Sequence, residues 1–139
     1  MKMRRVVSAV VTAVLASIGV VVVTGTPAWA ISDCRTPYTS GSWNATPCIE
    51  RRIVNGAYQY RAAGNMTTFP SNCSTYRAYI TEPDGTNYWS TGAWSCTHPY
   101  IETVWASFLG GTATGAKARL VAYNSSGAQI LNLLSPAVY

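Results

Sequence analysis

The fold is decided by residues 73–96, which read CSTYRAYITEPDGTNYWSTGAWSC. Both flanks of this stretch are rich in aromatic and β-branched side chains, which suit a pleated surface. Between the flanks stands Pro83-Asp-Gly-Thr, and Asp and Gly tolerate the positive φ of a tight turn. The stretch therefore predicts a β-hairpin, around which we expect an all-β fold.

The turn type decides the register of this hairpin. A two-residue turn at Asp84 and Gly85 places Cys73 directly opposite Cys96. A type I turn with Gly85 as the left-handed bulge residue offsets the two cysteines by one position. Both registers bring the cysteines to the open end of the hairpin, and both predict the disulfide Cys73–Cys96.

The four cysteines all lie after residue 30 and predict two disulfides in an oxidising compartment. Once Cys73 and Cys96 are paired, the second bridge is Cys34–Cys48. Each bridge should contribute about 3 kcal/mol by constraining the unfolded chain. Zinc is the alternative use of four cysteines, but no C-x-x-C pair occurs and His98 is the only histidine. We expect no metal and no other cofactor.

Residues 1–30 have the pattern of a cleaved secretory signal. Three basic residues precede an uncharged apolar run over 6–23, and Ala28-Trp-Ala, just after Pro27, matches a small-x-small cleavage site. The alternative is an uncleaved membrane anchor, because the apolar run approaches the length that spans a bilayer. The proline and the cleavage site favour the signal, so we expect a secreted, extracellular protein of residues 31–139 without a membrane anchor.

Removal of the signal also removes most of the positive charge. The whole chain has ten Lys and Arg against five Asp and Glu, a net charge of +5, but three of the basic residues lie in the signal. Residues 31–139 keep a net charge of +2. They contain no cluster of Lys and Arg that could neutralise a run of phosphates, so we expect no nucleic-acid partner.

The remaining chain predicts a small antiparallel β-sandwich of about seven strands, because turn signals recur at intervals of roughly ten residues. Residues 31–48 have loop chemistry and predict a disulfide-tied N-terminal loop segment, followed by a sandwich domain over 49–139. Residues 100–109 are apolar on both faces and predict a central strand. We expect an immunoglobulin-like arrangement, although the cysteine placement is not the immunoglobulin one.

Residues 49–61 leave two alternatives open. Asn55-Gly56 is a strong hairpin signal, but the same residues also fit one long strand with a bulge at Gly56. Residues 63–65 are predicted as a connection.

The ionisable groups predict no enzyme. His98 would have to be the base of a Ser-His-Asp triad, but no Gly-x-Ser-x-Gly elbow accompanies it. Glu50 and Glu102 could form a glycosidase pair, which needs two carboxylates about 5–10 Å apart. Exposed strand charges that discourage edge pairing are the simpler interpretation of these two residues.

The aromatic residues are the most suggestive feature, since residues 31–139 hold four Trp, nine Tyr and two Phe. Strand alternation divides the rings of the hairpin between two faces, one of which must serve the core while the other binds a partner. The alternative is that the domain covers both faces. The residues predicted to form the binding surface are Tyr79, Tyr88, Trp94, Arg77 and Trp43.

These observations favour a secreted, non-enzymatic interaction module. We expect an adaptor or small subunit of an extracellular assembly, for example an antibacterial one, that binds another secreted protein through its aromatic surface. The first alternative is a carbohydrate- or cell-wall-binding module, because aromatic rings also stack on sugars. The second is a protease inhibitor or small toxin, in which Arg51-Arg52, close to Cys48, would present a basic peptide.

Overall fold

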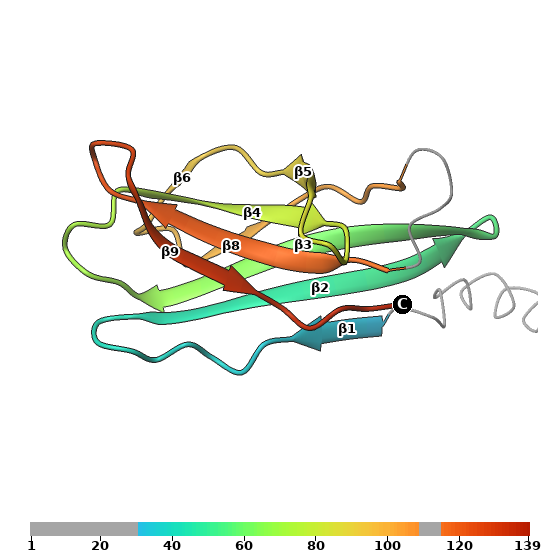
Figure 1. Cartoon of the computed structure of the whole chain (residues 1–139), viewed down its shortest axis with the longest axis horizontal. Coiled ribbons are helices and arrows are strands. Elements are labelled where there is room, and N and C mark those ends of the chain that lie inside the picture. Colours follow the sequence, from blue (N-terminus) through green and yellow to red (C-terminus); the bar gives the residue numbers. More distant parts are fainter. Residues whose placement is uncertain (1–30, 109–114) are drawn as a thin grey trace, which may run out of the picture.

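The computed structural model describes residues 31–108 and 115–139. In this part of the chain, nine strands and no helix form two antiparallel sheets that face each other (Figure 1). The predicted all-β sandwich is thereby confirmed. The predicted secretory signal lies outside the described residues, and within them no helix has the length and apolar character needed to cross a bilayer.

The two sheets contain four and five strands. The first has the order β1-β2-β3-β7, and its strands are β1 (Ile31–Cys34), β2 (Asn44–Val54), β3 (Ala57–Thr68) and β7 (Tyr100–Glu102). The second has the order β5-β4-β8-β9 with β6 also paired to β4, and its strands are β4 (Thr75–Thr81), β5 (Asn87–Ser90), β6 (Trp94–Ser95), β8 (Lys117–Tyr123) and β9 (Gln129–Leu134). Both predicted disulfides, Cys34–Cys48 and Cys73–Cys96, are present.

The strand connections differ from the immunoglobulin arrangement. In that arrangement the sheets are ABED and CFG, so the consecutive strands B and C lie in different sheets. Here β1, β2 and β3 follow one another as a meander within one sheet before the chain crosses to β4. The fold is a sandwich with nine described strands instead of about seven, and with its own connectivity.

The β2–β3 hairpin is longer than predicted. Its turn forms because Asn55 and Gly56 both adopt positive φ, 50° and 77°, as a two-residue type I′ turn requires. The hairpin alternative for residues 49–61 is therefore confirmed. β3 then continues through Gly64, a predicted connection residue, and packs there against Leu120 of β8 so closely that a Cβ at Gly64 would overlap with the leucine Cδ1.

The N-terminal segment 31–48, predicted as a loop, contains β1 and the first part of β2. Cys34 lies directly opposite Cys48 in the β1–β2 ladder, with 4.0 Å between their Cα atoms. Pro47 is the residue that argues against a strand here, because it has no N–H to donate. The Pro47 carbonyl accepts the Arg35 N–H at 3.1 Å, just past the end of β1. The Pro47 nitrogen faces the same side, where the ladder has already ended, so the ladder loses no hydrogen bond.

Residues 100–109, predicted as a central strand, form the short edge strand β7 and an irregular continuation along β3; residue 109 itself is not described. The Thr103 hydroxyl accepts the Ala62 N–H at 3.0 Å, and Ala106 rejoins Tyr60 through backbone hydrogen bonds of 2.8 and 2.9 Å. The segment has one extra residue between these two contacts. This bulge reverses the alternation of the side chains, which explains why both faces look apolar in the sequence.

The turn between β4 and β5 has the type I geometry with a bulge. The Glu82 N–H donates to the Thr86 carbonyl at 2.9 Å, and Gly85 adopts a left-handed φ of 94°. Asp84 stabilises the turn because its Oδ1 accepts the Thr86 N–H at 2.8 Å, and this hydrogen bond lowers the pKa of Asp84. At the turn, the register with the bulge at Gly85 is therefore the correct one.

The register then slips twice before the chain reaches the disulfide. Next to the turn, Thr81 pairs with Asn87, but Ile80 then pairs with Trp89 instead of residue 88. Further along, Tyr76 pairs with Trp94 instead of residue 93. Each slip turns the side chains that follow it to the opposite face of the sheet. The Cys73–Cys96 bridge still closes the open end, with 6.0 Å between the Cα atoms.

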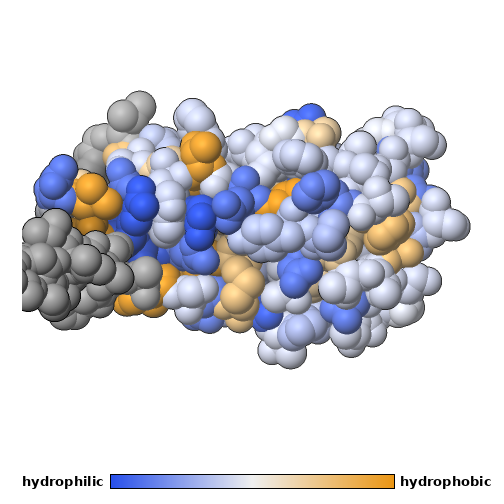
Figure 2. Space-filling view, turned by 180° about the vertical axis from the view of Figure 1, so that it is seen from behind, coloured by the Kyte–Doolittle hydropathy of each residue, from blue (hydrophilic) through white to orange (hydrophobic). Residues whose placement is uncertain are grey.

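The hydrophobic core lies between the two sheets and is built from the inward positions of both. On the face shown in Figure 2, by contrast, hydrophobic residues lie as separate spots among hydrophilic ones. The largest fully buried core side chains are those of Ile49, Tyr60, Met66, Tyr76, Ile80 and Leu120.

Candidate binding surfaces

The structure distributes the five predicted binding residues over different environments. Arg77 and Tyr79 lie on the outer face of the second sheet, whereas Trp94 lies opposite the core residue Tyr76 at its edge. The second register slip is the reason, because the β4–β5 pairing, continued without it, would have placed Trp94 opposite Thr75 on the outer face. The prediction that Tyr79, Tyr88 and Trp94 share one face of the hairpin is therefore wrong.

The two remaining predicted binding residues also pack against the domain. The Tyr88 ring lies 4.5 Å from that of Phe108, and its hydroxyl donates to the Ser107 carbonyl at 2.8 Å. Trp43 is half-buried against the hydrophobic core.

Exposed rings gather where the edges of the two sheets meet. We call Trp89, Trp94, His98 and Tyr100 the edge surface. The three large rings keep 49 %, 44 % and 44 % of their surface exposed. They lie on the same side of the sandwich because β5 and β6 occupy the free edge of β4 (Figure 1), and β7 of the other sheet packs against β4.

Contacts between neighbouring residues hold the edge surface together. The Trp94 and His98 rings lie 4.6 Å apart, and His98 Nδ1 lies 2.8 Å from the Tyr100 carbonyl oxygen. From below, the buried Tyr76 hydroxyl donates to the His98 carbonyl, and burial raises the pKa of Tyr76 to about 12. The connection between the two sheets is therefore fixed to the core beneath the exposed rings.

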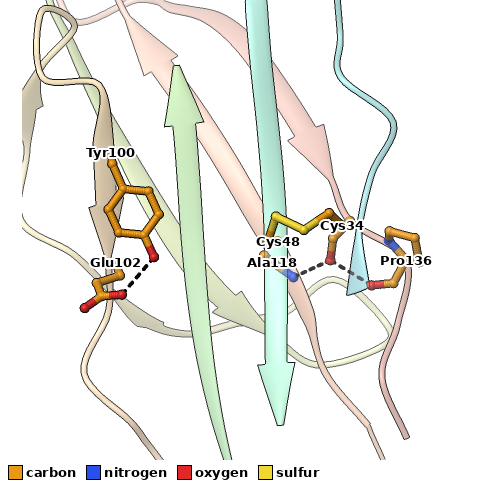
Figure 3. Close-up of a disulfide and its surroundings, with 7 residues drawn as sticks. Cys34, Cys48, Tyr100, Glu102, Ala118 and Pro136 are labelled. Carbon is orange, nitrogen blue, oxygen red and sulfur yellow. Dashed lines mark hydrogen bonds between the residues drawn. A yellow bond between two sulfur atoms is a disulfide. The ribbon is translucent and has the colours of Figure 1, made fainter. Parts of the chain in front are cut away.

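Beside the edge surface, the outer face of the first sheet carries an ion-pair network. Arg61 contacts Glu50 at 2.6 Å and Glu102 at 3.1 Å. The Tyr100 hydroxyl donates to Glu102 at 2.8 Å (Figure 3). Partial burial and this hydrogen bond raise the pKa of Tyr100 to about 12. The two carboxylates considered as a glycosidase pair are thus both ion-paired to one arginine.

The dibasic pair Arg51-Arg52 lies within β2, between its neighbours β1 and β3. Arg52 donates from Nε to Gln59 at 2.8 Å and stacks on the Trp105 ring at 4.2 Å. Arg51 stacks on Tyr58 at 4.8 Å. The peptide proposed for a protease inhibitor is therefore part of a paired strand.

The outer face of the second sheet is basic. We call Arg77, Tyr79, Arg119 and Tyr123 the basic face. Tyr79 lies opposite Arg119, and the Tyr79 and Tyr123 hydroxyls meet at 3.3 Å. The hydrogen bond with Tyr79 and partial burial raise the pKa of Tyr123, and the positive charges of Arg77 and Arg119 oppose this rise.

A hollow of about 370 Å³ opens at one end of the basic face. It is lined by Thr75, Arg77, Tyr123 and Gly127. Sequence analysis identified Arg77 but missed Tyr123. The alternation in residues 116–123 assigns Tyr123 to the outer face, but it does not reveal that β8 pairs with β4.

Among residues 31–108 and 115–139, no group of His, Cys, Asp and Glu side chains has the arrangement of a metal site. Comparison of the chain with protein-family models, with curated proteins and with solved structures finds no match.

Proposed function

We propose that this protein is a secreted, non-enzymatic interaction module that binds a partner protein through the edge surface. One observation carries the proposal, namely that three large aromatic rings lie nearly half exposed along one side of the sandwich. Aromatic residues, Trp above all, are enriched among the side chains that dominate binding energy, because they bury much area and lose little conformational freedom.

The backbone of this side favours recognition by side chains rather than by strand addition. Here β5 has four residues, β6 two and β7 three, and edges this short give an added strand few N–H and C=O groups to pair with. The partner should therefore offer an apolar recess for the rings of Trp89 and Trp94, with a polar rim around it.

The proposal is tested by capture from the culture medium of the producing cells. The bait is the disulfide-bonded secreted product, compared with its Trp89→Ala and Trp94→Ala variants. Tyr58→Ala is the matched control, because Tyr58 is 49 % exposed but lies at the far tip of the β2–β3 hairpin. Near-ultraviolet circular dichroism establishes that each variant is folded.

We expect one protein to be captured by the wild type and by Tyr58→Ala, and its capture to fall about tenfold or more in each Trp variant. Equal capture by all four proteins, or no capture at all, would contradict the proposal.

Secretion is part of the same proposal. Two disulfides are typical of an oxidising compartment. Amino-terminal sequencing of the product in the medium should start at Ile31; a product that keeps residues 1–30 would contradict cleavage after Ala30.

A glycan is the second candidate ligand, and Trp89 favours it. This indole is nearly half exposed and contacts no other ring within the described residues. Sedimentation with insoluble polysaccharides tests this alternative. If wild-type protein sediments and Trp89→Ala stays in solution, the edge surface binds sugar, and the protein partner is excluded as its primary ligand.

A further inference from the structure

The hollow on the basic face lies on the outer side of the second sheet, away from the ring-bearing edge. Its lining combines one guanidinium with the hydroxyls of Thr75 and Tyr123, and its volume of about 370 Å³ lies within the range of small-molecule sites. We propose that this hollow binds a carboxylate-bearing sugar residue, with the carboxylate on Arg77 and the ring hydroxyls on Thr75 and Tyr123.

The positive charge of the basic face is not neutralised by the protein. All five Asp and Glu residues lie in the described ranges, and the ion pairs found there join Glu50 and Glu102 to Arg61 on the other sheet. Arg119 donates to Asn87, a neutral group, at 3.2 Å. An incoming carboxylate would therefore reach the arginine without displacing an acidic side chain of the protein. Hydrogen bonds between such charged groups are stronger than those between neutral groups.

The tyrosine pair supplies a hydroxyl hydrogen for a ligand. When the Tyr79 and Tyr123 hydroxyls bond to each other at 3.3 Å, one of them donates and the other accepts. A hydroxyl has only one hydrogen, so the accepting tyrosine keeps its own hydrogen for another acceptor. Val121, which lies on the same outer face opposite Arg77, is only 3 % exposed.

The size and lining favour a sugar acid over an acidic side chain of a peptide. A single carboxylate would occupy only a small part of the hollow and would leave the Thr75 hydroxyl without a role. A pyranose ring with its own carboxylate and hydroxyls uses the guanidinium and both hydroxyl positions together.

The test is a calorimetric and NMR titration of the secreted product with three probes: glucuronate, glucose as the neutral ring, and the α-amide of N-acetylglutamate as a single carboxylate without a ring. A ligand of this size in an open site should bind with a Kd on the order of 1 mM. We expect glucuronate to bind and both other probes to bind at least about tenfold more weakly.

Variants locate the site. Arg77→Ala removes the guanidinium and should weaken glucuronate binding by about tenfold. Tyr123→Phe removes only a hydroxyl and should weaken it less. Lys117→Ala is the matched control, since it also removes one positive charge from this sheet, but Lys117 lies in β8 opposite Thr81, at the other end of β4 from the hollow. Tyr123→Phe keeps the ring, so it tests the site even if Arg77→Ala is unstable.

Three results would overturn the proposal. Equal binding of the N-acetylglutamate α-amide would assign the hollow to acidic side chains, and equal binding of glucose would remove the role of the charge. Absence of glucuronate binding, or equal weakening by Lys117→Ala, would remove the site itself. None of these outcomes bears on capture through the edge surface, so the two proposals fail independently.

Discussion

Replacement of Gly64 by alanine tests how tightly the two sheets are packed. Gly64 lies in β3 and faces Leu120 of β8 across the core. An added Cβ would overlap with Leu120 Cδ1, and it would lie 3.4 Å from Ile101 Cγ1 and 3.5 Å from Leu120 Cγ. The leucine must therefore rotate or the sheets must separate locally.

The cost depends on whether Leu120 has space to move. Leu120 is completely buried, and insertion of a methyl group into a well-packed core typically costs about 1–3 kcal/mol. We expect Gly64→Ala to lower the free energy of unfolding by about 2 kcal/mol. Leu120→Ala alone should cost about 2–5 kcal/mol through the cavity that it leaves.

The double variant separates packing from a general effect on the strand. In Gly64→Ala/Leu120→Ala, the new methyl group enters the space vacated by the leucine. The double variant should therefore lose at least about 1 kcal/mol less free energy of unfolding than the two single variants lose in sum. Urea unfolding followed by tryptophan fluorescence measures all four proteins. A single variant within about 0.5 kcal/mol of the wild type, or strictly additive costs, would refute the close approach.

Three further predictions concern the disulfide, the ion-pair network and the alkaline limit of stability. Replacement of both Cys34 and Cys48 by serine should lower the free energy of unfolding by about 3 kcal/mol, and an unchanged thermal midpoint would contradict a structural role for this bridge. Arg61→Met, which keeps the aliphatic stem on Trp105, should cost about 1 kcal/mol in urea unfolding, since the network is partly exposed; a more stable variant would show that the pairs contribute nothing. Because the folded pKa of Tyr76 is raised from 10.0 to about 12, its contribution is fully present below pH 10 and is lost as the pH rises through 12. Stability should therefore fall over that window, and less steeply in Tyr76→Phe; identical slopes in urea unfolding at pH 9–12 would refute this assignment.

The parts of the fold that were predictable from the sequence are those with local chemical signals. Asn55-Gly56 and Pro83-Asp-Gly specify their turns through backbone conformation, and both turns form as these signals indicate. The disulfide pairing follows from the second hairpin, because both registers bring Cys73 and Cys96 to its open end. These inferences needed no knowledge of distant contacts.

The failures have one common cause, namely that bulges change the face to which a side chain points. The second slip in the ladder of β4 moves Trp94 from the side of Thr75 to the side of Tyr76, and one extra residue after Thr103 ends the regular strand. Nothing in the local composition marks these positions, because a bulge is set by the neighbouring strand. For the same reason the Tyr79–Tyr123 pair, which joins two strands far apart in sequence, was not predictable.

The brevity of β5, β6 and β7 also bears on how the protein behaves at high concentration. A long unpaired edge strand would let one copy of the protein extend the sheet of another, and such growth leads to fibrils. Segments of two to four residues are too short to start that polymerisation. This side can thus display exposed aromatic rings without also offering a long backbone edge for strand addition.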